Sequence, residues 1–154
     1  MPAPQFSPYI SFPGNAAEAF AHYAEIFGGE LEISKYDDFP AMEMPFTPPP
    51  GAVAHAQLHG GLVTLAGGDG MAMEEGQVLP GLESEVYSYL IGLDTVEEAR
   101  ALIETMTSSG AEVAMPFELA PWGDHYGQVK DRYGVLWALV VGGSGPEGAP
   151  GQEA

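Results

Sequence analysis

The chain has 154 residues, which is the length of one ordinary domain or of two very small ones. Hydrophobic residues make up 45% of it, enough to bury a core, so a wholly disordered chain is excluded. Only 4 Lys and Arg residues oppose 22 Asp and Glu residues, for a formal charge of -18, which leaves no cationic footprint for nucleic acid or for an anionic membrane. Because there are no cysteines, disulfide scaffolds, thiolate zinc sites and thiol nucleophiles are excluded as well.

A capped amphipathic helix is predicted near the N-terminus. Asn15 and Glu18 have the spacing of a capping box, and apolar residues then recur every three or four positions as far as Phe27. Gly28-Gly29 ends the helix, because glycine adopts the left-handed C-terminal conformation at little cost. Strands are predicted on either side of this helix, from Phe6 to Phe12 and from Glu30 to Ser34.

A hairpin completes the first half of the chain. It runs from Val53 to His59, turns at Gly60-Gly61 and returns from Leu62 to Ala66. Two irregular stretches adjoin it, residues 37–51 and 67–82, and their Met and Phe content favours a lid on an apolar surface as much as a loosely ordered loop. Gly67-Gly68-Asp69-Gly70 is interpreted as a plain turn, since no Lys-Ser/Thr follows to make a phosphate loop.

The second half repeats the same order of elements. Thr95 and Glu98 form another capping-box pair, the helix ends at Ser109-Gly110, and a turn at residues 131–134 joins two later strands. The strands predicted here are Val86 to Leu93, Ala111 to Met115, His125 to Lys130 and Val135 to Val141. This is an internal duplication of about 80 residues. It predicts an α+β fold of two tandem βαβββ modules, at about 5–67 and 84–141, in one domain spanning 1–142, with a disordered tail at 143–154.

No segment has the features of a signal peptide or of a membrane span. The first residues lack a basic region and a long apolar run, and no stretch reaches about 18 consecutive apolar residues. We therefore expect a soluble cytoplasmic protein that binds neither membranes nor nucleic acid.

Two motifs carry a family resemblance. The first joins Pro8-Tyr9-Ile10-Ser11-Phe12 to Gly14-Asn15-Ala16-Ala17-Glu18-Ala19 and to Tyr23-Ala24-Glu25-Ile26-Phe27-Gly28-Gly29. The second runs from Trp122 to Asp131 and is closed by Tyr133-Gly134-Val135 and Trp137. Over about residues 5 to 141 the chain resembles the vicinal oxygen chelate superfamily of glyoxalase I, bleomycin-resistance proteins and extradiol dioxygenases, and within it the PhnB-like branch. His125 departs from the Arg common in this branch, and Arg132 from the Pro.

The resemblance implies the glyoxalase/bleomycin-resistance fold, a U-shaped half-open barrel, and a homodimer. Metal-using members of the superfamily carry His, Gln or Glu on the first strand of each module and Glu on the last. The matching positions here have neither imidazole nor carboxylate: Ser7, Tyr9, Ser11, Thr64, Tyr87, Ser88, Tyr89, and Trp137 or Ala138. Divalent ions need such ligands, so we expect no metal centre and no cofactor.

A different metal site is the alternative. His55 and His59 lie on one face of their predicted strand, and His125 could approach from the equivalent strand of the other module to bind zinc or nickel. The strand rise separates His55 from His59 by about 13 Å, too far for one ion without a bulge. Hydrogen-bonded or surface histidines are therefore favoured.

The resemblance also implies a cleft between the modules, lined by the inward faces of the strands. The residues placed there are Tyr9, His55, Gln57, Tyr87, Tyr89, Trp122, Asp124, Gln128 and Trp137. Aromatic rings with a few polar groups suit a small aromatic or apolar ligand, although Tyr and Trp are equally common as core residues. Asp124 and His125 are the catalytic candidates, because a carboxylate can tune an adjacent imidazole, whereas the competing interpretation has Asp124 capping backbone amides.

Three functions remain open. The preferred one is a metal-free protein that binds a small molecule, the second is a lyase, isomerase or dioxygenase using Asp124 and His125 or a non-standard metal, and the third is a structural dimer with a filled cleft. PhnB-like sequences are often described as ubiquinone-pathway methyltransferases. The sequence has no glycine-rich strand-to-helix fingerprint of a nucleotide-type cofactor, so it does not support that activity.

Overall fold

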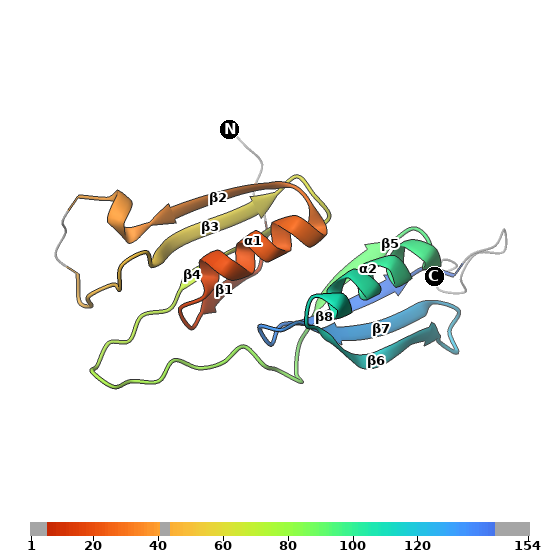
Figure 1. Ribbon diagram of the computed structural model, residues 1–154. Coiled ribbons are helices and arrows are strands. Elements are labelled where there is room, and N and C mark those ends of the chain that lie inside the picture. The colour runs from red at the N-terminus through yellow and green to blue at the C-terminus, as the bar shows by residue number, and fades with distance from the viewer. Residues whose placement is uncertain (1–5, 41–43, 144–154) are drawn as a thin grey trace. The chain divides into compact units, whose positions relative to one another are not determined.

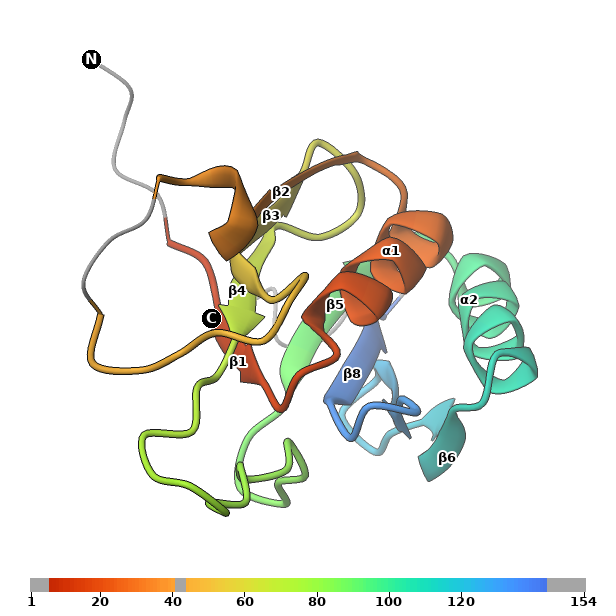
Figure 2. The same cartoon turned by 60° about the vertical axis from the view of Figure 1, so that its left-hand side comes forward.

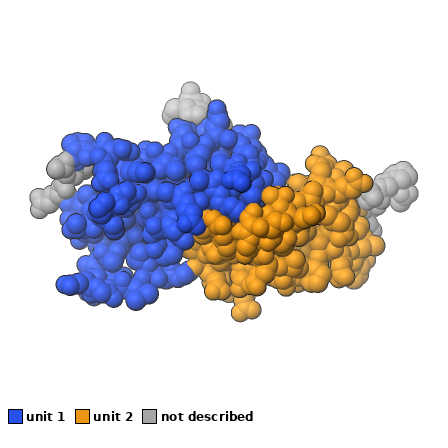
Figure 3. Space-filling model, viewed as in Figure 1, with its two compact units in different colours: residues 1–81 blue, residues 82–154 orange. Residues whose placement is uncertain are grey.

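The structure, a computed structural model, describes residues 6–40 and 44–143. The chain forms two compact units, residues 1–81 and 82–154, which are coloured separately in Figure 3. Each unit contains one α-helix and one open four-stranded sheet in the order strand, helix, strand, strand, strand (Figure 1). The predicted α+β fold with two βαβββ modules is therefore confirmed.

The first unit places one helix on a mixed sheet (Figures 1 and 2). Its sheet has the order β1-β4-β3-β2, with β1 parallel to β4 and the other pairs antiparallel. The Phe12 ring meets Phe20 of the helix edge-on at 5.7 Å, and both are fully buried. The elements are β1 (Tyr9–Phe12), α1 (Ala16–Phe27), β2 (Glu30–Lys35), the short 3-10 helix η1 (Tyr36–Asp38), β3 (Val53–His59) and β4 (Leu65–Asp69).

The second unit repeats this topology. Its sheet has the order β5-β8-β7-β6, again with the first strand parallel to the last, which confirms the duplication. The elements are β5 (Tyr89–Leu93), α2 (Val96–Ser108), β6 (Glu112–Leu119), β7 (His125–Lys130) and β8 (Leu136–Val141). Helices α1 and α2 have 12 and 13 residues, and no helix in the described part of the chain has the length and apolar character needed to cross a membrane.

The cap of helix α1 differs from the prediction. Asn15 makes no capping hydrogen bond, and its Oδ1 is buried without a partner. Instead, Asp69 at the end of β4 accepts a hydrogen bond from the Ala16 backbone N–H at 2.8 Å, and its other oxygen accepts one from Val53 at 2.9 Å. A carboxylate from a distant strand thus replaces the local cap. The predicted N-cap of α2 is confirmed, because Thr95 Oγ1 accepts from the Glu98 N–H at 3.1 Å. The Glu98 carboxylate accepts from the Thr95 hydroxyl at 3.0 Å, whereas the predicted capping box has it accept from the Thr95 backbone N–H.

The returning strand of the first hairpin begins later than predicted. Gly61 lies against the backbone of Gly28, where a Cβ on Gly61 would be 2.4 Å from the carbonyl carbon. The Leu62 N–H then bonds the last carbonyl of α1, that of Phe27, at 3.0 Å, so this segment closes the helix end before strand pairing starts. Consequently β4 runs from Leu65 to Asp69, and the predicted turn at residues 67–70 is mostly strand.

Strand β6 is longer than predicted and irregular. It continues past Met115 to Leu119, and its pairing with β7 shifts register between Val113 and Met115 and again between Met115 and Glu118. Pro116 lies in the second of these irregularities, which suits a residue that cannot donate to a ladder and is confined to edge strands and bulges. The first strands of the two units also begin later than predicted, at Tyr9 and Tyr89.

The Pro- and Met-rich stretch 37–51 is held to its own unit where it is described. The Gly51 N–H donates to Asp37 Oδ2 at 2.8 Å, and the Phe46 ring lies edge-on to Tyr36 at 5.7 Å. Residues 41–43 of this stretch, and residues 144–154 of the predicted tail, lie outside the described residues. The proposed lid role of the stretch and the disorder of the tail stay predictions.

Candidate functional site

Three of the predicted ligand-binding residues share the exposed face of the first sheet. The Tyr9 and His55 rings stack with centroids 6.1 Å apart, and Tyr9 is 56% exposed. Gln57 and Tyr9 both pair with Ala66 of β4, so their side chains lie in one row across the sheet. Burial and then the nearby Tyr36 phenol raise the pKa of Tyr9 above its usual 10.0, so Tyr9 is a neutral hydroxyl at neutral pH. This face therefore offers aromatic and neutral polar groups.

Two other predicted residues lie on the helix-covered face of the second sheet. Tyr89 and Trp137 are partners in the β5–β8 ladder, with ring centroids 5.7 Å apart, and Trp137 is 2% exposed. Trp137 also pairs with Val129, which lines a cavity together with Arg100 and other residues of α2. The buried Trp137 is thus a core residue of this unit. The pKa of Tyr89 is raised by burial and, to a lesser extent, by Tyr87.

Gln128 lies on the opposite face of that sheet. Its ladder partner is Ala138, whereas the next residue of β7 pairs with Trp137, and successive strand residues point to opposite faces. Gln128 Nε2 donates to the Tyr126 hydroxyl on the same face at 3.0 Å. Gln128 and Trp137, which the sequence placed together, therefore face different sides of the sheet.

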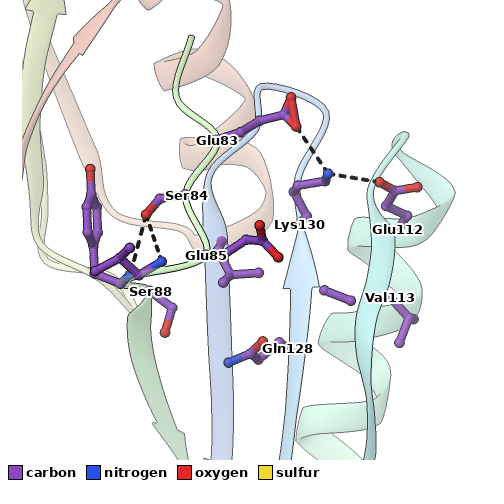
Figure 4. Close-up of a pocket in the computed structure, with 12 residues that line it drawn as sticks. Glu83, Ser84, Glu85, Ser88, Glu112, Val113, Gln128 and Lys130 are labelled. Carbon is purple, nitrogen blue, oxygen red and sulfur yellow. Dashed lines mark hydrogen bonds and ion pairs between the residues drawn. The ribbon is translucent and has the colours of Figure 1, made fainter.

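A cavity of about 640 Å³ is lined by both Gln128 and Tyr87. Figure 4 shows Gln128 among the labelled residues of this cavity. Its volume is within the range of small-molecule sites in proteins. One wall is the segment of residues 82–88, here called the strap, which runs into β5, and the other walls come from β6, β7 and β8. We call this cavity the strap pocket. Its lining residues are Glu83, Ser84, Glu85, Val86, Tyr87, Ser88, Glu112, Val113, Ala114, Gln128, Lys130 and Leu136.

Lys130 fastens the strap to the sheet. Its Nζ lies 3.2 Å from a carboxylate oxygen of Glu83 in the strap and 3.3 Å from one of Glu112 in β6, as the dashed lines of Figure 4 show. The hydrogen bonds to Glu83 and then to Glu112 raise the pKa of Lys130 above its usual 10.5. The ammonium is therefore charged at neutral pH and already engaged by two carboxylates.

A local turn shapes the strap next to the pocket. Ser84 Oγ accepts hydrogen bonds from the backbone N–H groups of Val86 at 3.0 Å and Tyr87 at 3.4 Å. Such a serine turn satisfies backbone donors that would otherwise join a ladder, which explains why β5 does not start at Val86 as predicted. As a result, the Tyr87 side chain remains 61% exposed beside the pocket.

The two predicted catalytic residues, Asp124 and His125, contact different groups. Asp124 Oδ1 accepts a hydrogen bond from the Gly143 backbone N–H at 2.9 Å, whereas the His125 ring stacks on Phe117 with centroids 5.7 Å apart. The Asp124 contact fits the alternative in which this carboxylate caps a backbone amide. Trp122, in the connection between β6 and β7, is 59% exposed. A catalytic role for Asp124 and His125 stays a prediction.

The residues at the superfamily's metal positions do not fit a divalent ion. On the faces of β1, β4, β5 and β8 that α1 and α2 leave uncovered, the ladder partners are Tyr9 with Ala66, Ser11 with Gly68, and Leu90 with Ala138. Hydroxyl and alkyl groups without imidazole or carboxylate are a poor ligand set for zinc or the hard divalent ions. No group of three or more His, Cys, Asp or Glu residues within 6–40 and 44–143 is arranged to hold a metal ion.

The three histidines of the alternative metal site each contact a different group. His59 Nε2 lies 2.8 Å from a carboxylate oxygen of Glu32, and His59 Nδ1 lies 3.9 Å from one of Glu30. His55 stacks on Tyr9 in the same unit, while His125 belongs to the second unit and stacks on Phe117.

Sequence reasoning missed the charged lining of the strap pocket. Glu83, Glu85 and Glu112 were part of the general acidity of the chain, and no motif distinguished them. Lys130 lay in the second family motif but had no predicted role. The available signal was the pair Glu83 and Glu85 directly before the aromatic Tyr87. Its meaning depended on the strap crossing the sheet beside Lys130, which no local pattern predicts.

Comparison with known proteins gives the family. Residues 4–140 match the model of a family described as 3-demethylubiquinone-9 3-methyltransferase. Protein YjdN of Escherichia coli (strain K12) is 30% identical over 146 residues, which cover 88% of this chain and 93% of YjdN. Protein PA1353 from Pseudomonas aeruginosa has a crystal structure similar to this one, with a TM-score of 0.71 and 28% identity over 89% of this chain and 96% of that one.

A third relative shares the fold. It is a putative 3-demethylubiquinone-9 3-methyltransferase, PhnB protein, from Bacillus cereus, with a TM-score of 0.65 and 22% identity over 90% of this chain and 99% of that one. The family's description names a methyl transfer, yet the connections from β1 to α1 and from β5 to α2 are short and not glycine-rich. The family model spans most of the chain and YjdN matches along nearly all of its length, so the chain belongs to the 3-demethylubiquinone-9 3-methyltransferase family, the PhnB-like branch of the vicinal oxygen chelate superfamily.

Proposed function

We propose that this protein binds a small molecule with an aromatic or apolar portion in the strap pocket. The observation that carries the proposal is the cavity of about 640 Å³, in which an exposed tyrosine ring, an amide side chain and alkyl groups converge. Small-molecule sites combine apolar walls with a few polar groups that orient the ligand in this way. Tyr87 supplies the aromatic wall, Val86 and Leu136 supply alkyl surface, and Gln128 supplies the oriented polar group.

The Gln128 amide is already positioned for such a role. Its Nε2 group is held by the Tyr126 hydroxyl at 3.0 Å, which fixes the plane of the amide. A ligand therefore meets a polar group whose rotamer is restrained before binding, and this lowers the entropy lost on association. The exposed Tyr9–His55 face of the first sheet has similar chemistry, but the strap pocket combines such groups with a defined cavity.

A fragment screen tests the proposal. The full chain would be screened by ligand-observed NMR against small aromatic and aliphatic compounds, and hits would be located by backbone and Gln side-chain shift changes. A ligand in the strap pocket should perturb the Gln128 side-chain amide together with residues of the strap. The proposal would be abandoned if hits perturbed only residues outside this pocket, or if a broad library gave none.

A pocket-filling substitution supplies the matched control. Ala114 is exposed on edge strand β6 and lines the pocket, so Ala114→Phe should reduce ligand affinity about tenfold or more without disturbing the core. Ala101→Phe makes the same change at an exposed position of α2 outside the pocket, and it should leave affinity unchanged. Equal losses in both variants would contradict binding at the strap pocket.

We propose in addition that the chain forms a homodimer, as relatives in the superfamily commonly do. Edge strand β6 supports this proposal, since Val113, Met115 and Leu119 on it are 45% to 63% exposed. Unpaired edge strands and exposed apolar residues are typical of surfaces that another chain covers. Sedimentation equilibrium of the full chain would give twice the monomer mass, and a single monomeric species at micromolar concentration would overturn the proposal.

A further inference from the structure

We infer that the strap pocket selects organic cations, and in particular ligands with a protonated amine attached to an aromatic or apolar portion. The inference rests on the proposed function and adds the charge class of the ligand. Its basis is the inventory of charged and hydrogen-bonding groups that remain available in the pocket.

The charges of the pocket are unbalanced. Three glutamates and one lysine line it, which gives a formal charge of -2. Glu83 and Glu112 share the single ammonium of Lys130, at 3.2 Å and 3.3 Å. Glu85, in contrast, makes no hydrogen bond or ion pair with any residue of the described chain. Figure 4 shows Glu85 and Gln128 in the same pocket, apart from the Glu83–Lys130–Glu112 bridge.

An anionic ligand would meet no available cation. Lys130 is the one basic residue in the lining, and an anion could pair with it only by displacing Glu83 or Glu112. Either displacement would leave a carboxylate beside the incoming negative charge. The pocket therefore disfavours carboxylates and phosphates through short-range repulsion, in addition to the long-range repulsion of a chain with charge -18.

The groups that remain free mostly accept hydrogen bonds. The Glu85 carboxylate is an acceptor only, and Gln128 keeps its Oε1 free because its Nε2 is the atom that bonds Tyr126. An alkylammonium presents three donors and no acceptor, so it matches this inventory. The exposed Tyr87 ring adds a π-face that attracts a cation. Charge, hydrogen-bond polarity and the aromatic wall thus favour the same class of ligand.

Three probes of nearly equal size and shape separate charge from fit. They are 2-phenylethylamine, which is protonated at pH 7, the neutral 2-phenylethanol, and the anion phenylacetate. Dissociation constants would be measured on the full chain by NMR titration, following the Gln128 side-chain amide. The amine should bind about 3- to 10-fold more tightly than the alcohol, and phenylacetate should bind more weakly than either. The preference for the amine should shrink as salt is raised from 20 mM to about 500 mM.

A pair of charge-neutralising variants assigns the preference to Glu85. Glu85→Gln should remove the difference between amine and alcohol, because the amide keeps the shape of the side chain and loses its negative charge. Glu97→Gln changes the net charge equally, at an exposed position of α2 outside the pocket, and should keep the preference. If the alcohol binds as tightly as the amine, the cation inference fails while the proposed function stands. If none of the probes perturbs the pocket at millimolar concentration, the proposed function fails with it.

Discussion

The indole Nε1–H of Trp137 donates a hydrogen bond of 2.9 Å to Oδ2 of Asp131, and both residues are buried. The other carboxylate oxygen accepts from the backbone N–H groups of Tyr133 at 2.9 Å and Val135 at 3.0 Å. A single carboxylate at 4% exposure therefore organises the β7–β8 turn and anchors the largest core side chain of the second unit. Because the buried charge is surrounded by donors, its hydrogen bonds offset the cost of removing it from water.

Neutralising this carboxylate should destabilise the protein. Asp131→Asn keeps the shape but turns an acceptor into an N–H donor that faces either the indole N–H or the turn amides, so we expect a loss of about 2 kcal/mol in the free energy of unfolding. Trp137→Phe removes the indole donor and part of the core volume. Urea unfolding of both single variants and of the double variant, followed by circular dichroism, should give a coupling of at least about 1 kcal/mol. Additive effects would show that the hydrogen bond does not stabilise the fold.

The unexpected cap of helix α1 predicts how much each of three capping variants loses in the free energy of unfolding. Asp69→Ala removes the acceptor of both Ala16 and Val53 and should cost about 2 kcal/mol. Thr95→Ala removes a cap with one bond to the helix and should cost about 1 kcal/mol. Asn15→Ala removes an unpartnered buried oxygen and should cost less than about 0.5 kcal/mol.

The three variants would be compared by urea unfolding at one pH. A loss in Asn15→Ala equal to that in Thr95→Ala would mean that Asn15 caps the helix in solution, as its spacing to Glu18 predicts. An Asp69→Ala variant as stable as the unchanged chain would refute the long-range cap.

The sequence was sufficient for the fold because its signals are local and repeated. Apolar periodicity, helix-ending glycines and strand patterns occur twice in the same order, and each half supports the interpretation of the other. The cap of α1 could not be predicted, since Asp69 lies 53 residues from Ala16 and the same Asn15-to-Glu18 spacing occurs with or without a hydrogen bond. The predicted ends of strands were wrong where a tertiary contact, such as that of Gly61 with Gly28, outweighed the local preference of the residues for strand.

The candidate site was less predictable than the fold. Tyr87 and Gln128 were chosen from the sequence and lie in one pocket. Trp137 lies on the opposite face of the sheet, because the register of strand pairing decides which face each side chain occupies. The three glutamates of the pocket carry no local pattern. They become a group only through the strap, which a serine turn and an ion pair hold near β7.

The close approach of the paired strands β6 and β7 predicts opposite outcomes for two glycine substitutions. A Cβ at Gly127 would lie 2.6 Å from the Cα of Phe117, whereas a Cβ at Gly92 in β5 would meet no atom within 4 Å. Gly127→Ala should therefore cost at least about 2 kcal/mol, because the backbone of the bulged strand must move. Gly92→Ala should be neutral or slightly stabilising, since alanine reduces the entropy of the unfolded chain. Thermal unfolding of both variants tests this, and a neutral Gly127→Ala would contradict the close approach.

The bridge from Lys130 to Glu83 and Glu112 should stabilise the protein only while the lysine is protonated. The pKa of Lys130 is raised in the folded state, so its contribution is complete below the unfolded value of about 10.5 and is lost as pH rises through the folded-state pKa. Lys130→Met should lower the urea midpoint at pH 8, and its difference from the unchanged chain should vanish towards pH 12. Lys35→Met, an equal change in net charge at an exposed lysine of the first unit, should show a smaller and less pH-dependent difference. If Lys130→Met still lowered the urea midpoint by the same amount at pH 12, the strap would be held by packing of the aliphatic part of the lysine side chain and not by the ion bridge.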